Sequence, residues 1–139
     1  MIRRLSYSNP SSKLPGAVTL SPQPGYTWLV RELVVITTTT SGAGTRYLSA
    51  MINRGALLTA IITSSALVFF NVSLGASASN GWYIGPVPGA TLLNVTATNT
   101  ALLQTPICLS SLDSLTISPS SYLVGDALYW AAIIEEVLD

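Results

Sequence analysis

Apolar and polar residues alternate with a period of two along much of the chain, which is typical of β-strands. The clearest case is residues 26–40, where Trp28, Val30 and Val34 share one face of an extended chain and Leu33 and Val35 share the other. Both faces are apolar. We therefore expect one face to lie in the protein's own core and the other beneath a second layer or another subunit.

The glycine-rich stretch at residues 41–44 predicts a turn after this strand, and residues 45–54 alternate as an antiparallel return strand would. Arg46, Leu48 and Ile52 share one face of it. Arg31 and Glu32 should point to opposite faces of the first strand, so each needs a partner from elsewhere. The pattern thus predicts a long hairpin.

Further strands are predicted at intervals of roughly 8–12 residues, separated by Gly and Pro, a spacing typical of a sandwich or jelly roll. The predicted fold class is all-β, an antiparallel β-sandwich or jelly roll with a flexible N-terminal arm. Residues 1–15 form the arm in this interpretation, since they show no hydrophobic period, and residues 16–139 form one jelly-roll domain. The additional predicted strands cover residues 16–20, 57–63, 67–74, 82–84, 90–98, 107–109, 115–117 and 127–137.

Charge is scarce: charged residues make up 9% of the 139 residues and hydrophobic residues 49%, against roughly a quarter charged in an ordinary soluble domain. Six basic and six acidic side chains balance. Without clustered positive charge we expect neither nucleic acid nor a membrane as partner. So little charge suits a surface covered by permanent protein contacts, and we expect a homo-oligomer.

Residues 56–74 are uncharged and apolar enough to offer an alternative, a membrane-spanning helix. Interrupting Thr, Ser and Asn residues, and a content of Ile, Val, Phe and Thr, favour strands instead.

Histidine is absent, which removes the commonest general base and zinc ligand. Glu135 and Glu136 would face opposite sides of a strand, and Cys108 lies in an apolar run where a thiol is usually inert. Asp113 and Asp126 are left as alternatives for a folded glycosidase pair or a calcium site, against the simpler interpretation that both occupy turns. We expect no enzyme, no metal and no cofactor.

Trp82 and Tyr83 follow a loop of small residues and are the candidate binding residues. An exposed aromatic pair can stack on a sugar or anchor a protein interface, whereas a buried pair would close the end of the barrel. If exposed, they favour the alternative function, a carbohydrate- or receptor-binding module such as a tail or spike tip.

Over residues 16–139 the order of these features resembles the jelly-roll capsid decoration (cement) proteins of tailed bacteriophages. The features that carry the resemblance are residues 24–30 (PGYTWLV), the threonine-rich stretch 37–45, the apolar 106–109 (PICL), the strand 112–118, and the closing segment from Gly125-Asp126 to Glu135-Glu136.

The resemblance implies a non-enzymatic virion subunit, commonly a homotrimer, that binds the outer surface of the major capsid protein shell and stabilises it. Such proteins use an N-terminal arm to reach over the shell. On this chain Arg3, Arg4 and Lys13 would then be the candidate residues that meet an acidic capsid surface.

Overall fold

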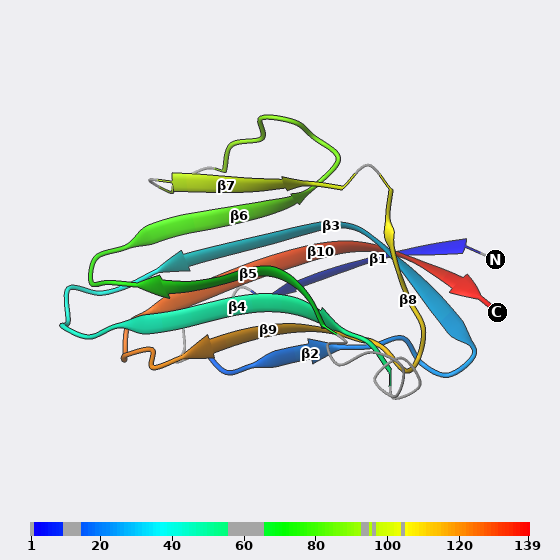
Figure 1. Ribbon diagram of the computed structural model, residues 1–139, viewed down its shortest axis with the longest axis horizontal. Coiled ribbons are helices and arrows are strands. Elements are labelled where there is room, and N and C mark those ends of the chain that lie inside the picture. Colours follow the sequence, from blue (N-terminus) through cyan, green and yellow to red (C-terminus); the bar gives the residue numbers. More distant parts are fainter. Residues whose placement is uncertain (1, 10–14, 56–65, 93–94, 96, 104) are drawn as a thin grey trace.

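The computed structural model describes residues 2–9, 15–55, 66–92, 95, 97–103 and 105–139. It confirms the all-β prediction: two sheets pack face to face as a sandwich, and the described residues contain no helix (Figure 1). The strands are β1 (Ile2–Asn9), β2 (Val18–Leu20), β3 (Tyr26–Thr38), β4 (Arg46–Asn53), β5 (Ala66–Leu74), β6 (Ser79–Gly85), β7 (Ala97–Leu102), β8 (Ile107–Leu109), β9 (Ser114–Ser120) and β10 (Ala127–Leu138).

The larger sheet has the order β1-β10-β3-β6-β7, and β8 pairs with β3 next to the end of β6. The smaller sheet has the order β2-β9-β4-β5. Without β7 and β8, the chain passes back and forth between two four-stranded sheets, with the first two strands beside the last two. This is the strand order of a jelly roll. All pairs are antiparallel except β6 with β7.

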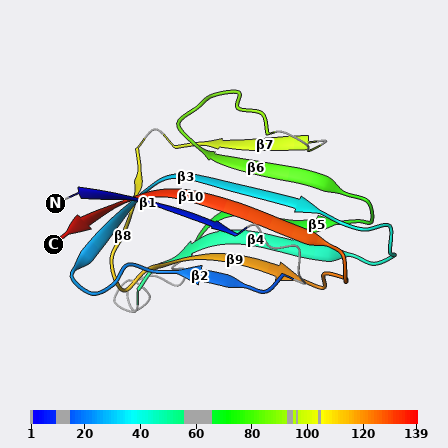
Figure 2. The ribbon, with the colours of Figure 1, turned by 180° about the vertical axis from the view of Figure 1, so that it is seen from behind.

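The first strand differs from the sequence prediction, because Ile2–Asn9 form β1 where a flexible arm is expected. β1 lies at the edge of the larger sheet, antiparallel to β10, and both termini are at the same end of the sandwich (Figure 2). An edge strand needs only one neighbour for its backbone hydrogen bonds, so it can form from a segment without hydrophobic alternation. Residues 10–14, including Lys13, lie outside the described residues.

The predicted hairpin between residues 26–40 and 45–54 is wrong, since β3 belongs to the larger sheet and β4 to the smaller one. The connection crosses from one sheet to the other, and the apolar faces of the two strands meet across the core. Alternation gives the length and the face of a strand, but not the sheet in which it pairs.

A β-bulge at Arg31 corrects the predicted faces of β3. The register with β10 shifts between Ile133 and Ile134, so Val30 and Leu33 both point into the core although they are three residues apart. A bulge adds one residue to one strand of a pair and reverses the alternation beyond it. Leu33 and Val35 therefore join Trp28 and Val30 inside the sandwich.

The core consists of the inner faces of both sheets. Phe70 of β5 and Trp82 of β6 stack across it with ring centroids 4.3 Å apart and planes 12° from parallel. Each large apolar side chain buried in this way contributes about 1.5–3 kcal/mol. The fully buried members include Val30, Leu33 and Val35 of β3, Leu48 and Ile52 of β4, Leu115 and Ile117 of β9, and Ile134 of β10.

Candidate functional site

The aromatic pair singled out by the sequence is buried, so of the two alternatives left open by the sequence, the exposed stacking platform is wrong. Trp82 is 6% exposed and Tyr83 5% exposed. Trp82 points into the core, where it stacks on Phe70. The carbohydrate-binding alternative thereby loses the residues on which it rests.

Tyr83 lies on the opposite face of β6, and its burial depends on the connection that leads to β7. The Tyr83 hydroxyl oxygen accepts a hydrogen bond from the Val87 N–H at 3.2 Å. At Gly81, on the same face, the Leu92 side chain takes the space of a β-carbon: a Cβ built there would lie 2.5 Å from Leu92 Cδ1. Both contacts come from the irregular connection after β6, whose path across this face does not follow from the alternation of apolar and polar residues in the strand.

Arg3 and Arg4 of β1 are paired within the chain. They lie opposite Glu136 and Glu135 of β10, and each forms an ion pair with the residue opposite it. Their guanidinium ends nevertheless remain accessible, because the two side chains are 64% and 69% exposed. The glutamates face opposite sides of β10, as the sequence predicts. Each carboxylate also contacts a second side chain.

Glu136 accepts a hydrogen bond from the buried Trp28 indole N–H at 3.0 Å, and this bond together with Arg3 holds the pKa of Glu136 below its usual range. Glu135 is 2.8 Å from Arg31, which with Arg4 lowers the pKa of Glu135 in the same way. Arg31 thus finds its partner elsewhere in the fold, as predicted. The Tyr83 hydroxyl donates a hydrogen bond to Glu32 at 3.4 Å. Arg31 and Glu32 were expected on opposite faces of β3. Because of the bulge they lie on the same face, which is also the face of Glu135.

Ion pairing inside the chain accounts for most of its few charges. In the described residues, five ion pairs use nine of the twelve charged side chains of the sequence. Glu32 and Asp139 have hydrogen-bond partners in Tyr83 and Thr27. Little net charge is therefore left to repel a neutral or apolar partner surface.

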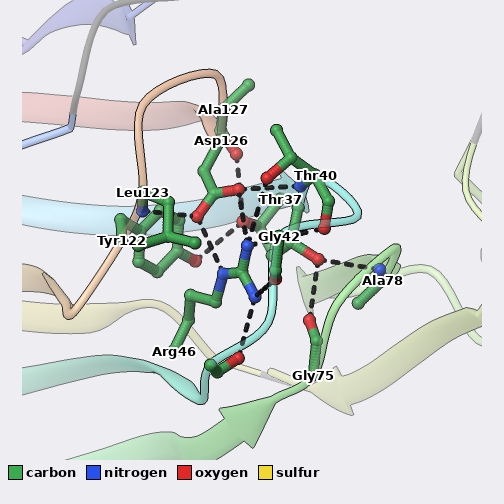
Figure 3. Close-up of polar contacts among 12 residues, drawn as sticks. Thr37, Thr40, Gly42, Arg46, Gly75, Ala78, Tyr122, Leu123, Asp126 and Ala127 are labelled. Carbon is green, nitrogen blue, oxygen red and sulfur yellow. Dashed lines mark hydrogen bonds and ion pairs between the residues drawn. The ribbon is translucent and has the colours of Figure 1, made fainter.

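One of these pairs, Arg46 with Asp126, is fully buried and fastens one end of the sandwich (Figure 3). Arg46 Nε and Nη2 lie 2.9 and 3.2 Å from the two carboxylate oxygens of Asp126. Asp126 also accepts the backbone N–H groups of Thr40 and Leu123, each at 2.7 Å. Burial alone would raise the pKa of Asp126, but the hydrogen bonds from Arg46 and the backbone outweigh it, so the pKa lies far below its ordinary value.

Three connections meet at this end. Arg46 donates to the carbonyl oxygens of Gly42 and Gly44, both at 2.8 Å, within the β3–β4 connection. Asp126 holds the β9–β10 turn, and Thr39 bonds the Gly75 carbonyl in the β5–β6 connection at 2.8 Å. The sequence signal was a charged residue, Arg46, on the apolar face of a predicted strand, since such a charge needs a buried partner.

The β9–β10 turn presents an apolar tip on this rigid support. Its ends are joined by a hydrogen bond from the Asp126 N–H to the Leu123 carbonyl at 3.0 Å. Gly125 has φ +92°, the left-handed conformation that a type II turn requires at its third position. Val124, at the tip, is 88% exposed.

The outer face of the smaller sheet is uncharged across β4, β5 and β9. Register places Met51 of β4 between Val68 of β5 and Thr116 of β9, and Ser49 between Asn71 and Ser118. Tyr47 and Val68 are each half exposed. This surface is suited to contact with another neutral protein surface.

Asp113 and Asp126 lie in turns at opposite ends of β9, so they do not form a carboxylate pair. Asp113 accepts the backbone N–H groups of Gly55 and Ser110, each at 2.9 Å. The described residues bring no three His, Cys, Asp or Glu side chains together as a metal site. The candidate pair and calcium ligands of the sequence are thus turn residues with protein partners, while Cys108 is exposed on β8 instead of buried.

Within the described part of the chain, no helix is long and apolar enough to cross a membrane. Of the segment 56–74, residues 66–74 are strand β5, and residues 56–65 lie outside the described residues.

No protein-family model, curated protein or solved structure matches the chain. We therefore infer the function from the surface and the contacts of this chain itself.

Proposed function

We propose that the chain is a non-enzymatic viral structural protein, a capsid decoration (cement) subunit. In this proposal it binds the outer surface of a major capsid protein shell as a homotrimer and stabilises that shell. The fold alone does not carry the proposal, because jelly rolls also serve unrelated functions. The resemblance in sequence pattern supplies the capsid role, and the chemistry of the surface supports it.

The observation that carries the proposal is the combination of internal charge pairing with exposed apolar side chains. Among the described residues, nine charged side chains are engaged in ion pairs within the chain. Several large apolar side chains remain exposed at the surface: Tyr47, Val68, Val87, Leu102, Leu112, Val124 and Leu138. A surface that is low in charge and studded with apolar groups resembles those that obligate subunits bury against one another.

The proposed mechanism is burial of neutral and apolar surface between copies and against the shell. A contact of standard size buries about 1,600 Å² in total. Many copies on one particle add avidity, so a modest affinity for each site suffices. The Arg46–Asp126 pair keeps the loop end rigid, which lowers the entropic cost of docking. Arg3 and Arg4, with exposed guanidinium ends on β1, are available to acidic groups of the shell.

The test is binding to shells assembled from the major capsid protein encoded with this chain. Purified chain is mixed with empty shells and separated on a density gradient. We expect the chain to sediment with the shells at a fixed number of copies per capsid protein, and the decorated shells to resist a higher temperature or denaturant concentration. A chain that stays at the top of the gradient contradicts the proposal.

A further inference from the structure

The two sheets of the sandwich differ in width on one side. β5 ends the smaller sheet, and it faces β6 across the core through the Phe70–Trp82 stack. The larger sheet continues for one more strand, β7, which pairs with β6. Within the described residues, no strand of the smaller sheet lies opposite β7. Figure 1 shows β7 beyond β6 at the outer limit of the larger sheet. Among the described residues, one strand position beside β5 is therefore open.

The open position has an apolar floor. A cleft of about 170 Å³ lies between β5 and β7, lined by Phe69, Phe70, Trp82, Tyr83, Ile84, Asn99, Thr100 and Ala101. None of these side chains is charged. Phe69 and Val72 of β5 pack against the core but remain only partly buried. Apolar side chains from an added strand would complete their burial.

Of the devices that protect an edge strand, β5 lacks charge, proline and shortness, although its register with β4 shifts between Ala50 and Met51, as at a β-bulge. β1 carries Arg3 and Arg4, and β2 has three residues and is followed by Pro22 and Pro24. β5 has nine residues with neither a charge nor a proline, and it is rich in Val, Leu and Phe. Such an edge offers unpaired backbone N–H and C=O groups to another extended chain.

We propose that this slot, defined by the free edge of β5 and the cleft beside β7, receives one extended, uncharged segment of a neighbouring shell protein as an added strand. The inference rests on the proposed function and names its docking site. The width of the slot favours a single segment. If β5 of a second copy paired with β5 here, the β7 strand of each copy would occupy space already taken by the larger sheet of the other copy. The apolar lining calls for apolar residues at alternate positions of the segment, since alternate side chains of a strand face the cleft.

The experiment compares two matched lysine substitutions in the shell-binding assay. Val72→Lys places an ammonium group on the inner side of β5, beside the slot. Val18→Lys places the same group at a partly buried valine of β2, the opposite edge strand of the same sheet. An inward-pointing charge is a natural guard against strand addition. We expect Val72→Lys to lower the number of shell-bound copies by about tenfold or more, and Val18→Lys to bind as the wild type does.

The folded state of both variants is checked by thermal unfolding. If Val72→Lys fails to fold, Asn71→Lys on the exposed face of β5 takes its place, with Thr19→Lys on the exposed face of the opposite edge strand β2 as control. Equal shell binding by the β5 variant and its control overturns the slot while leaving the proposed function intact. A wild-type chain that does not bind shells overturns the proposed function, and with it the partner named here.

Hydrogen exchange gives an independent measurement on the wild type. We expect the amides on the free edge of β5 to exchange rapidly in the isolated chain and to slow by at least about tenfold on the shell, as a strand hydrogen bond forms. Slow exchange that is already present in the isolated chain would show that the slot is filled by the protein itself, and would overturn the inference.

Discussion

Arg46 and Asp126, eighty residues apart in the sequence, form a bidentate ion pair with both side chains fully buried. The pair joins the start of β4 to the turn before β10, and through backbone groups it fixes the connections that converge at this end of the sandwich. Removing one partner would leave the other charged group buried without compensation.

We therefore predict that Arg46→Gln lowers the free energy of unfolding by about 3–5 kcal/mol, measured by denaturant titration. Arg4→Gln is the matched control. Arg4 is largely exposed and lies 3.5 Å from Glu135, so its loss should cost less than about 1 kcal/mol. Equal effects of the two substitutions would refute the structural role assigned to the buried pair.

Below about pH 8, stability should depend on pH only on the acid side. The pKa values of Asp113, Asp126, Glu135 and Glu136 are all lowered in the folded protein. A lowered folded-state pKa contributes stability that is complete above the unfolded pKa of about 4 and is lost as the pH falls through the folded pKa. We predict a free energy of unfolding that is constant from about pH 5.5 to 8, since the chain has no histidine, and that declines below about pH 4. A maximum near pH 4 would contradict this assignment.

All three tryptophans should be shielded from solvent. Trp28, Trp82 and Trp130 are 4%, 6% and 8% exposed. We predict emission typical of buried indole and little quenching by iodide, with both properties changing on unfolding. Iodide quenching of about a third of the native emission would mean that one indole ring is exposed, and would contradict the burial of all three.

A substitution at the apolar tip of the β9–β10 turn should change binding without changing stability. Val124 is almost fully exposed, so Val124→Ser should change the free energy of unfolding by less than about 0.5 kcal/mol. If the tip contacts the shell or another copy, the same substitution should weaken that association severalfold. The control is Gly125→Ala, which should lower stability by roughly 1 kcal/mol or more, because Gly125 has a positive φ. Unchanged association in Val124→Ser would remove the tip from the proposed contact surface.

The fold class and most strand positions could be predicted from the sequence because burial on a sheet imposes a period of two. The return strand from Arg46 to Ile52 shows this, since its predicted faces match the observed burial. The exceptions are β1, where an arm was expected, and β7, which covers Ala97–Leu102 instead of the predicted residues 90–98. The sheet in which each strand pairs could not be predicted. Alternation does not say whether β3 and β4 pair with each other or face each other across the core, and it cannot reveal the bulge at Arg31.

The candidate site was harder to predict, because exposure depends on tertiary contacts. Trp82 is buried against Phe70 of the other sheet, Tyr83 is covered by the connection that contains Val87, and Cys108 is exposed although its neighbours are apolar. The open edge of β5 likewise becomes apparent only when the strand orders of the two sheets are compared. A single sequence reports which residues can be buried, and the tertiary fold decides which of them are.

The most direct test of the account is the mass of the purified protein in detergent-free solution, measured by light scattering. In the proposed assembly, the low-charge surface is covered by further copies of the chain. We predict a homotrimer of about three times 14.6 kDa. A well-behaved monomer of 14.6 kDa that persists as the protein concentration is raised would contradict self-assembly.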